Sequence, residues 1–523
     1  MPVPADGRYV LTVDLGTGGP KVGLVSTHGQ LAARRHVAVA TRRLPGGGAV
    51  QDAGAWWDAV RGAARRLVGA GAVDPARIVA VSCTGQWAST VPVGADGVPV
   101  GDCLLWLDTR GGRHTRAAIG GPVQGYAPLP LLRWIRHSAG VPSLAGADPV
   151  GHMLAIEHGQ PAVARATRWY LEPVDYLTMR FTGVAAATHA SMAGAWLTDN
   201  RDPATLAYDP DLVRMAGVPP DKLPPLVPFG TVVGEVLAAV ATDLGLPPGV
   251  QVVAGTPDLH SAAVGSGAVA EHQAHLALST SSWVSCPVPR KKTDPIRQIA
   301  TVPGLSTHGY LVADNHETGG RALEWARDTL FPASPPMSRP DLGALTSMAA
   351  EVPPGAGGVL FTPWLSGERS PVSDPSARGG FHNLSLRSSR PELVRSVLEG
   401  VAYNSRWLFE AVERFVGHRL PVVRMLGGGA SSSLWCRIHA DVLDRTVEQV
   451  ADPVYANLRG AALLAGIALG DLAPEEVRSC VPVAGTFEPD PTTRAVYDGR
   501  FAEFPRLYRA QKGLFRRLNH SDT

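Results

Sequence analysis

The segment at residues 251–267 reads QVVAGTPDLHSAAVGSG, and it lies almost at the midpoint of the 523-residue chain. Its apolar beginning is typical of a buried strand, and a single carboxylate, Asp258, follows the turn that ends this strand. Because open α/β sheets hold their ligand clefts at the carboxyl ends of strands, we interpret Asp258 as a catalytic base. The alternative is that Asp258 only caps a helix beginning at Leu259, since Asp is a preferred N-cap residue.

The length and composition of the chain set limits on its organisation. A single hydrophobic core stops growing at roughly 250 to 300 residues, so we expect two domains. The net charge of +2 provides no basic field and therefore argues against a nucleic-acid partner. Five cysteines without C-x-x-C spacing indicate neither a zinc site nor a disulfide framework and favour a cytoplasmic setting. No signal peptide and no run of about 18 apolar residues is present, so we expect no membrane partner.

The two halves predict similar orders of strands and helices. In the first half we expect strands at 9–13, 21–25, 30–40 and 78–82 and a helix at 55–68, in the order β-β-β-α-β. In the second half we expect another meander at 275–288, 297–302 and 309–313, and helices at 321–330, from Pro391 to Gly417, at 431–443 and at 457–469, with a strand at 422–426. Such a mixture predicts an α/β fold.

A glycine-rich turn, DLGTGGPK at residues 14–21, lies inside the first expected hairpin. Backbone N–H groups around Gly18 can converge on a phosphate, to which Thr17 adds a hydroxyl and Lys21 a charge. Asp14 can hold a magnesium ion directly or through water. The alternative is a plain hairpin turn, which is a common use of glycine.

The second half carries two further candidate nucleotide contacts. Ser279 and Thr280 stand where the first half has its glycine loop, and their hydroxyls can face a phosphate from the opposite side. Gly428, Gly429 and Ala430 follow a strand and precede a helix, so that a nucleotide can approach bare backbone at the N-terminus of the helix.

Two segments that follow strands combine aromatic faces with hydrogen-bonding groups, as pockets for polyhydroxylated molecules do. They are TGQWAS at residues 84–89 and WLDTR at residues 106–110. The candidate substrate contacts are Gln86, Trp87, Ala88, Trp106 and Asp108, together with Asp258 and Leu259. Alternatively, Arg110 and Asp108 only form a surface salt bridge.

These motifs occur together in the order in which a known family carries them. The chain resembles the FGGY carbohydrate kinases, most closely their xylulokinase branch, over about residues 8–470. The motifs that carry the resemblance are Asp14 to Thr17 with Lys21, Gly85-Gln86, Trp106 with Asp108 and Arg110, Asp175 to Leu177 with Thr182-Gly183, Asp258, Leu365 to Arg369, Glu399 to Ala402, and Gly427 to Ala430 with Trp435. The resemblance implies two ribonuclease H-like, actin-like ATPase domains facing a central cleft, an N-terminal domain at residues 1–265 for the sugar and the catalytic base and a C-terminal domain at residues 266–523 for the nucleotide. ATP and Mg²⁺ would bind on one side of the cleft and a sugar or polyol on the other.

The resemblance also implies roles for individual residues. Asp258 would take the proton from the substrate hydroxyl and Asp14 would help to place magnesium. Thr17 and the loop of Ser279 and Thr280 would face the phosphates of ATP. Gly428, Gly429 and Ala430 would receive the adenosine. Such an arrangement meets the needs of phosphoryl transfer, which are positioning, charge neutralisation and a base.

At four positions the sequence departs from the family pattern. Trp87-Ala88 replaces Met-His, Leu259 replaces a polar amide, and Ser279 replaces a glycine. Two hypotheses follow. The first is an ATP-dependent kinase acting on a ketopentose such as D-xylulose or on a related sugar or polyol, with a homodimer as one assembly it could form. The second is a sugar- or nucleotide-binding regulator on the same fold, because a fold does not fix function.

Overall fold

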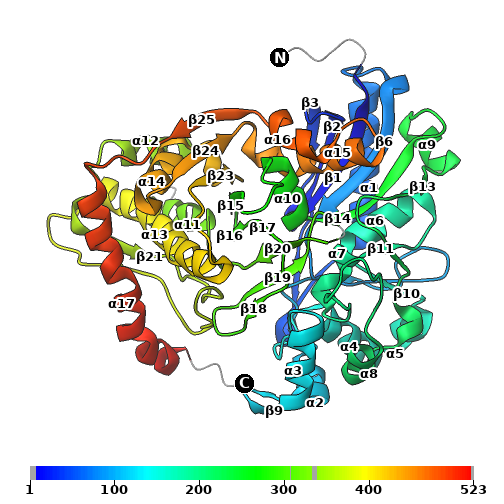
Figure 1. Ribbon diagram of the computed structural model, residues 1–523, viewed down its shortest axis with the longest axis horizontal. Helices are drawn as coiled ribbons and strands as arrows, with labels where there is room; N and C mark the ends of the chain where they lie inside the picture. Colours follow the sequence, from blue (N-terminus) through cyan, green and yellow to red (C-terminus); the bar gives the residue numbers. More distant parts are fainter. Residues whose placement is uncertain (1–6, 307, 332–338, 520–523) are drawn as a thin grey trace.

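The computed structural model describes residues 7–306, 308–331 and 339–519 as two lobes side by side (Figure 1). The first lobe is built on a six-stranded sheet in the order β13-β14-β6-β1-β2-β3. Its strands are β1 (Tyr9–Gly16), β2 (Gly19–Ser26), β3 (Leu31–His36), β6 (Ile78–Gly85), β13 (Val232–Glu235) and β14 (Gln251–Pro257). β1, β2 and β3 form the expected antiparallel meander, and β6 and β14 run parallel to β1. The sequence prediction for this sheet is confirmed.

The helices of the first lobe cover its sheet and also form a separate cluster. α1 (Ala53–Gly69) buries Trp56, Val60 and Leu67 against the sheet, on the face that helical spacing predicted. The other helices are α2 (Gly112–Ile119), α3 (Pro128–His137), α4 (Pro149–Gly159), α5 (Pro161–Ala166), α6 (Pro173–Thr182), α7 (His189–Met192), α8 (Pro210–Ala216), α9 (Ala238–Leu244) and α10 (Asp258–Ser266). Residues 111–160, for which the sequence indicated no role, belong mostly to a helical cluster with its own core around Trp134 and Tyr170.

Short strands complete the first lobe. They are β4 (Arg42–Leu44), β5 (Gly48–Gln51) and β8 (Cys103–Leu104) in one small sheet, the pairs β7 (Val91–Val93) with β10 (Trp169–Leu171) and β11 (Ala187–Thr188) with β12 (Leu226–Val227), and β9 (Gly120–Val123).

The second lobe is built on a five-stranded sheet in the order β16-β15-β23-β24-β25. Its strands are β15 (Ala274–Leu278), β16 (Ser282–Ser285), β23 (Val422–Leu426), β24 (Thr446–Val450) and β25 (Val483–Phe487). The expected single meander is only partly correct, because the strands after β16 pair in another sheet in the order β17-β20-β19-β18. These strands are β17 (Pro287–Val288), β18 (Thr293–Asp294), β19 (Ile299–Pro303) and β20 (Tyr310–Ala313), and β21 (Leu360–Thr362) pairs with β22 (Gly380–His382).

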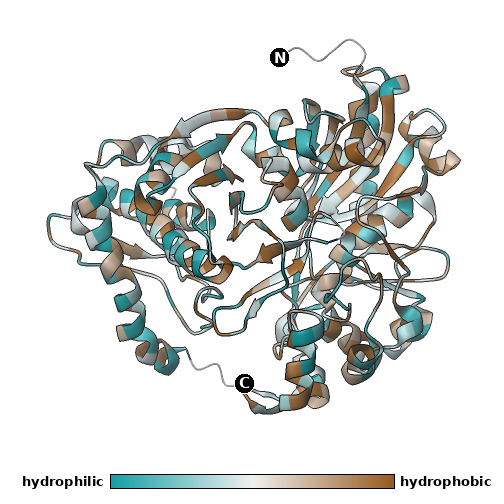
Figure 2. Cartoon of the chain, viewed as in Figure 1, coloured by the Kyte–Doolittle hydropathy of each residue, from teal (hydrophilic) through white to brown (hydrophobic). Residues whose placement is uncertain are grey.

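The second lobe buries its core around one long helix, α13 (Arg390–Val416). A Ser389/Glu392 capping box begins this helix, and Gly417, at φ 73°, ends it as expected. The remaining helices are α11 (Arg321–Leu330), α12 (Leu342–Ala350), α14 (Ser433–Leu443), α15 (Ala456–Ala468), α16 (Val477–Cys480) and α17 (Arg494–Leu518). Figure 2 shows mixed hydropathy along α17, which packs Phe504 and Tyr508 into the core through one face.

Two helices cross between the lobes, and each packs on the sheet of the other half. α10 packs through Ala262 on β15 and β23, whereas α15 packs through Leu458, Ala462 and Ala465 on the first sheet. Where the two helices meet, Gly265 and Gly460 bring their backbones together. A methyl group on Gly265 would overlap the carbonyl oxygen of Ala456 and lie 3.0 Å from the Gly460 nitrogen.

No helix in the described part of the chain is long and apolar enough to span a membrane. All five cysteines are free thiols.

Candidate active site

Asp258 and Asp14 lie at the same edge of the first sheet. Asp14 on β1 is in register with Thr84 on β6, and Thr84 is in register with Thr256 on β14, two residues before Asp258. The carboxyl ends of these parallel strands therefore meet where both carboxylates stand, which is the expected position of a ligand cleft. Burial and the neighbouring Asp14 charge raise the pKa of Asp258 to about 7.

The capping alternative for Asp258 is not the geometry observed. Pro257 occupies the N-cap position of α10, and Asp258 is the first residue of the helix. Its Oδ1 accepts only the N–H of the next residue, Leu259, at 2.8 Å among the described hydrogen bonds. The side chain is partly exposed, so the carboxylate is available to a ligand.

Lys21 holds Asp14 from the opposite strand of the hairpin. Asp14 and Lys21 are paired across β1 and β2, and Lys21 Nζ lies 2.9 Å from Asp14 Oδ2. The Asp14 charge raises the pKa of Lys21, which therefore stays protonated. The turn itself is a tight hairpin with Thr17 and Gly18 at its tip, as the plain-turn alternative describes. Gly19, at φ 118°, cannot carry a side chain because a Cβ would overlap the Val37 carbonyl oxygen.

Thr17 joins two of the residues that we expected to contact a sugar. Its Oγ1 donates to Gln86 Oε1 at 3.2 Å and accepts from Trp106 Nε1 at 3.3 Å. The structure thus brings Thr17, expected to face phosphate, together with Gln86 and Trp106. Sequence reasoning did not find this link, because residues 17, 86 and 106 are far apart in the chain.

Trp87 and Leu259 pack between the lobes. Leu259 is buried in an apolar cluster with Ala193, Val302 and Leu311, against which Trp87 packs. Trp87 Nε1 donates to the Ser191 carbonyl at 2.7 Å. The described contacts of these two side chains are therefore with protein.

The Ala88 backbone is in the left-handed region, with φ 58°. Such a conformation is uncommon for a residue with a side chain and often marks functional loops. The chain bends at this residue, two positions after Gln86.

Asp108 is committed to contacts within the protein. Its carboxylate is buried and accepts from the Ala49 N–H at 2.9 Å, from the Arg110 N–H at 3.0 Å and from Arg110 Nη2 at 2.7 Å. The salt bridge expected as the alternative is therefore present, but it is buried at the Asp108 end and not a surface pair.

A cavity of about 370 Å³ lies in the second lobe beside the β15–β16 turn. It is within the usual size range of small-molecule sites. Its lining residues are Ser279, Thr280, Gly320, Arg321, Leu323, Glu324, Leu342, Gly343, Thr346, Gly428, Gly429, Ser431, Ser432 and Trp435. Four of the expected nucleotide contacts thus lie together here.

The three glycine-loop residues differ in their surroundings. Gly428 is exposed and has open space where a Cβ would stand, whereas a Cβ on Gly429 would meet the Leu278 side chain at 2.5 Å. Ala430 is buried and does not line the cavity. The wall formed by Leu342 and Thr346 of α12 was not found from the sequence, because that segment shows no motif.

Two buried acids, Glu172 and Asp175, lie behind residues 86–89; the sequence analysis named Asp175 only within a family motif and predicted no place in the site for either acid. Glu172 Oε2 accepts from the Ser89 N–H at 3.1 Å, and Asp175 Oδ2 accepts from Ser191 Oγ at 2.8 Å. The second oxygen of each carboxylate is buried without a partner among the described residues. Burial raises the pKa of both groups well above their usual range. Ser89 Oγ also accepts from the Trp106 N–H at 3.0 Å, so this layer supports both expected sugar-binding segments.

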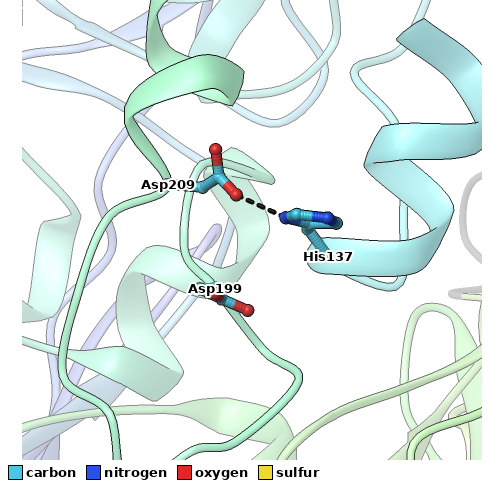
Figure 3. A group of neighbouring side chains, drawn as sticks. All are labelled: His137, Asp199 and Asp209. Atoms are coloured by element: carbon cyan, nitrogen blue, oxygen red, sulfur yellow. Dashed lines mark hydrogen bonds and ion pairs between the residues drawn. The ribbon is translucent and has the colours of Figure 1, made fainter. Parts of the chain in front are cut away.

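One group of potential metal ligands lies elsewhere, among His137, Asp199 and Asp209 (Figure 3). His137 Nδ1 is 2.5 Å from Asp209 Oδ2, and Asp209 Oδ1 accepts N–H groups at the start of α8. Asp199 forms a salt bridge with Arg201 at 2.5 Å. Because His137 and Asp209 pair with each other and Asp199 pairs with Arg201, we assign no metal to this group.

Sequence models of two domains match this arrangement. The "FGGY family of carbohydrate kinases, N-terminal domain" matches residues 9–265, and the "C-terminal domain" of the same family matches residues 280–469. The chain belongs to the FGGY family of carbohydrate kinases. It is therefore a phosphotransferase of the carbohydrate kinase type, as the first hypothesis expected.

Individual relatives agree with this membership. The chain is 26% identical over 519 residues to the xylulose kinase of Staphylococcus epidermidis, covering 97% of this chain and 98% of the relative. It is 24% identical over 481 residues to the gluconokinase of Bacillus subtilis, covering 89% and 88%. The solved xylulose kinase of Lactobacillus acidophilus has a TM-score of 0.85 at 22% identity, covering 98% of this chain and 100% of the other. This likeness confirms the expected fold of two actin-like ATPase domains.

ATP, the family's phosphate donor, is compatible with the residues present. The cavity in the second lobe has hydroxyl groups from Ser279 and Thr280 and exposed backbone at Gly428. Hydroxyl donors and bare backbone are the groups that bind phosphates.

Proposed function

We propose that this FGGY kinase transfers the γ-phosphoryl group of ATP to a hydroxyl of a neutral ketopentose such as D-xylulose, with Asp258 as the general base. The observation that carries the proposal is the partly exposed Asp258 carboxylate at the end of β14, whose pKa is raised to about 7. A base is most efficient when its pKa lies near the working pH. Asp258 accepts only one hydrogen bond from the described residues, so it can accept another from a substrate hydroxyl.

The other residues have supporting roles in this proposal. Gln86 and Trp106, joined through Thr17, would bind the sugar by hydrogen bonding and stacking. Asp14 would hold Mg²⁺, a role that suits a single carboxylate because protein-bound magnesium usually has only one or two carboxylate ligands. Magnesium would neutralise phosphate charge when bound. Lys21 would hold the Asp14 carboxylate in place through their ion pair.

The charges around Asp258 favour a neutral substrate over an aldonate. The Bacillus subtilis relative is named a gluconokinase, and gluconate carries a carboxylate. Among the described residues that we assign to this side of the site, both cations are already paired, Lys21 with Asp14 and Arg110 with Asp108. The buried acids Glu172 and Asp175 lie behind the site. A substrate carboxylate would therefore be desolvated beside acids without a free cation, which is costly.

The test is ADP release with magnesium and ATP against xylulose, other ketopentoses, polyols and gluconate. We expect turnover with a neutral sugar, and we expect Asp258→Asn to lower kcat by about 10² to 10⁴, as for a lost general base. Asp58→Asn, at an exposed position on α1, is the matched control and should leave kcat unchanged. Turnover with gluconate alone would refute the substrate class, and full activity of Asp258→Asn would refute the base.

A further inference from the structure

The two residues that follow Asp258 bind the second lobe. Leu259 packs in the cluster that contains Val302 of β19 and Leu311 of β20. His260 is fully buried, and its Nε2 lies 2.7 Å from the carbonyl oxygen of Pro303, at the end of β19. Because a carbonyl oxygen only accepts hydrogen bonds, Nε2 carries the proton and donates it to Pro303. The first turn of α10 is therefore fastened to β19.

The ring of His260 is fixed by aromatic neighbours as well. Trp87 stands edge-on to it, with ring centroids 6.1 Å apart, and Phe229 is tilted against it at 5.6 Å. Burial lowers the pKa of His260 to about 4, so the ring is neutral and has a single donor at neutral pH. Trp87 belongs to the segment that includes Gln86. His260 thus contacts this segment on one side and β19 on the other.

The position of Asp258 depends on this turn of helix. Its only described side-chain hydrogen bond is to the N–H of Leu259, its own neighbour, so no distant group orients the carboxylate. A general base must stand within about 2.6 to 3.2 Å of the hydroxyl it deprotonates. A misplacement of about 1 Å can cost roughly 10²-fold in rate.

We propose that His260 is a positioning residue for the Asp258 base. Its hydrogen bond to Pro303 fixes the first turn of α10 to the second lobe, so that the base keeps its place relative to the phosphate donor bound there. This inference rests on the proposed role of Asp258. If His260 only filled the core, it would contribute volume and stability. If it positions Asp258, the rate must depend on the hydrogen bond that its Nε2–H donates to Pro303.

The test separates these roles with two substitutions. His260→Phe keeps an aromatic ring beside Trp87 and Phe229 but removes the donor. His260→Gln places a side-chain N–H near the position of Nε2. We expect kcat with the neutral sugar to fall about 10-fold or more in His260→Phe, with KM for ATP within about twofold of wild type, and we expect His260→Gln to recover most of the loss.

Rates are measured per ATP-binding site, counted by nucleotide titration, so that unfolded protein does not enter kcat. His382→Phe is the matched control, because His382 on β22 also bonds through Nε2, to Thr362, and we assign it no part in the site. If the His260→Phe variant does not fold, the His260→Asn variant is measured in its place. The Asn side chain is shorter than that of His and does not reach the Pro303 carbonyl oxygen.

Equal kcat in wild type and His260→Phe, or equal losses in His260→Phe and His260→Gln, would overturn the positioning role while leaving the kinase proposal intact. Absence of wild-type turnover with every neutral sugar would refute the proposed function first, and the role of His260 with it.

Discussion

Lys21 Nζ lies 2.9 Å from Asp14 Oδ2, and the two charges act in opposite directions on Asp258. The Asp14 carboxylate raises the pKa of Asp258, whereas the Lys21 ammonium lowers it. The pair therefore sets how readily the proposed base is ionised.

Lys21→Met should shift the pH dependence of the reaction. Without the ammonium, the pKa of Asp258 rises, so the acid limb of kcat/KM moves to higher pH. We also expect kcat to fall by about 10², because Asp14 loses the partner that positions it. Steady-state rates from pH 5 to 9 measure both effects. Lys21→Arg keeps the positive charge, so the acid limb of its kcat/KM profile should lie at the same pH as in wild type. A Lys21→Met profile that superimposes on wild type contradicts this role.

The wild-type enzyme should lose activity below about pH 7. The base acts only when ionised, and its pKa is raised to about 7, so kcat/KM rises with pH up to that value and then levels off. Below the midpoint the rate should fall about tenfold per pH unit. Initial rates at constant ionic strength test this expectation. A midpoint near pH 4 would show that neither burial nor Asp14 acts on Asp258 as described.

Asp258→Asn should make the protein more stable at neutral pH while removing its activity. The pKa of Asp258 is about 7 in the folded protein and 3.8 without the fold, so the folded state binds the proton more tightly. Wild-type stability therefore decreases as pH rises from about 4 to 7 and is then constant. Because Asn does not ionise, its Tm advantage should be absent at pH 4 and reach a few degrees at pH 8. A Tm difference independent of pH would argue against the raised pKa.

The neighbouring glycines of the second-lobe cavity should respond differently to alanine. Gly428→Ala meets open space, so Tm should stay within about 1 °C, but its methyl group stands at the cavity wall and should raise KM for ATP several-fold. Gly429→Ala meets the Leu278 side chain at 2.5 Å and should lower the free energy of unfolding by about 1 to 3 kcal/mol, as overpacking does. Melting curves and ATP titrations of the two variants distinguish these effects. Identical behaviour of both would exclude nucleotide contact at Gly428.

Much of the fold was predictable because strands and helices have short-range signals. The run from Val422 to Leu426 and the helix from Pro391 to Gly417 were found from apolar periodicity and caps. The placement of β17 to β20 in a separate sheet was not found, because pairing depends on tertiary contacts that alternation does not encode.

The site was predictable only as a set of residues. Asp14 and Asp258 were predicted from their places after expected strands, and the structure puts both carboxylates at one edge of the first sheet, while their roles stay predictions. The burial of Asp108 beneath Ala49 and the packing of Leu259 against β19 and β20 were not found, because both depend on segments distant in sequence. Residue type predicted a polar or apolar contact in each case but not its partner.

The crossing of α10 and α15 should tolerate no side chain. Gly265→Ala would place its methyl group on the Ala456 carbonyl, so the helices must separate, and we expect a loss of about 3 kcal/mol or more in unfolding free energy. Gly499→Ala is the control, because Gly499 is exposed on α17 and a Cβ built there meets no neighbouring atom within 4 Å. This substitution should stabilise the protein by up to about 1 kcal/mol. Urea unfolding of the two variants compares them. A wild-type midpoint for Gly265→Ala would mean that the helices do not touch as described.

The exchange of helices between the lobes has a consequence for how the protein comes apart. Each half of the chain donates one helix to the sheet of the other, so the covalent connection at residues 267–273 is not what holds the halves together. A protease that cut this connection would leave two fragments that stay associated through the packing of α10 and α15 on the sheets. To separate the halves, both helices would have to leave the sheets on which they pack, whether or not this connection is intact.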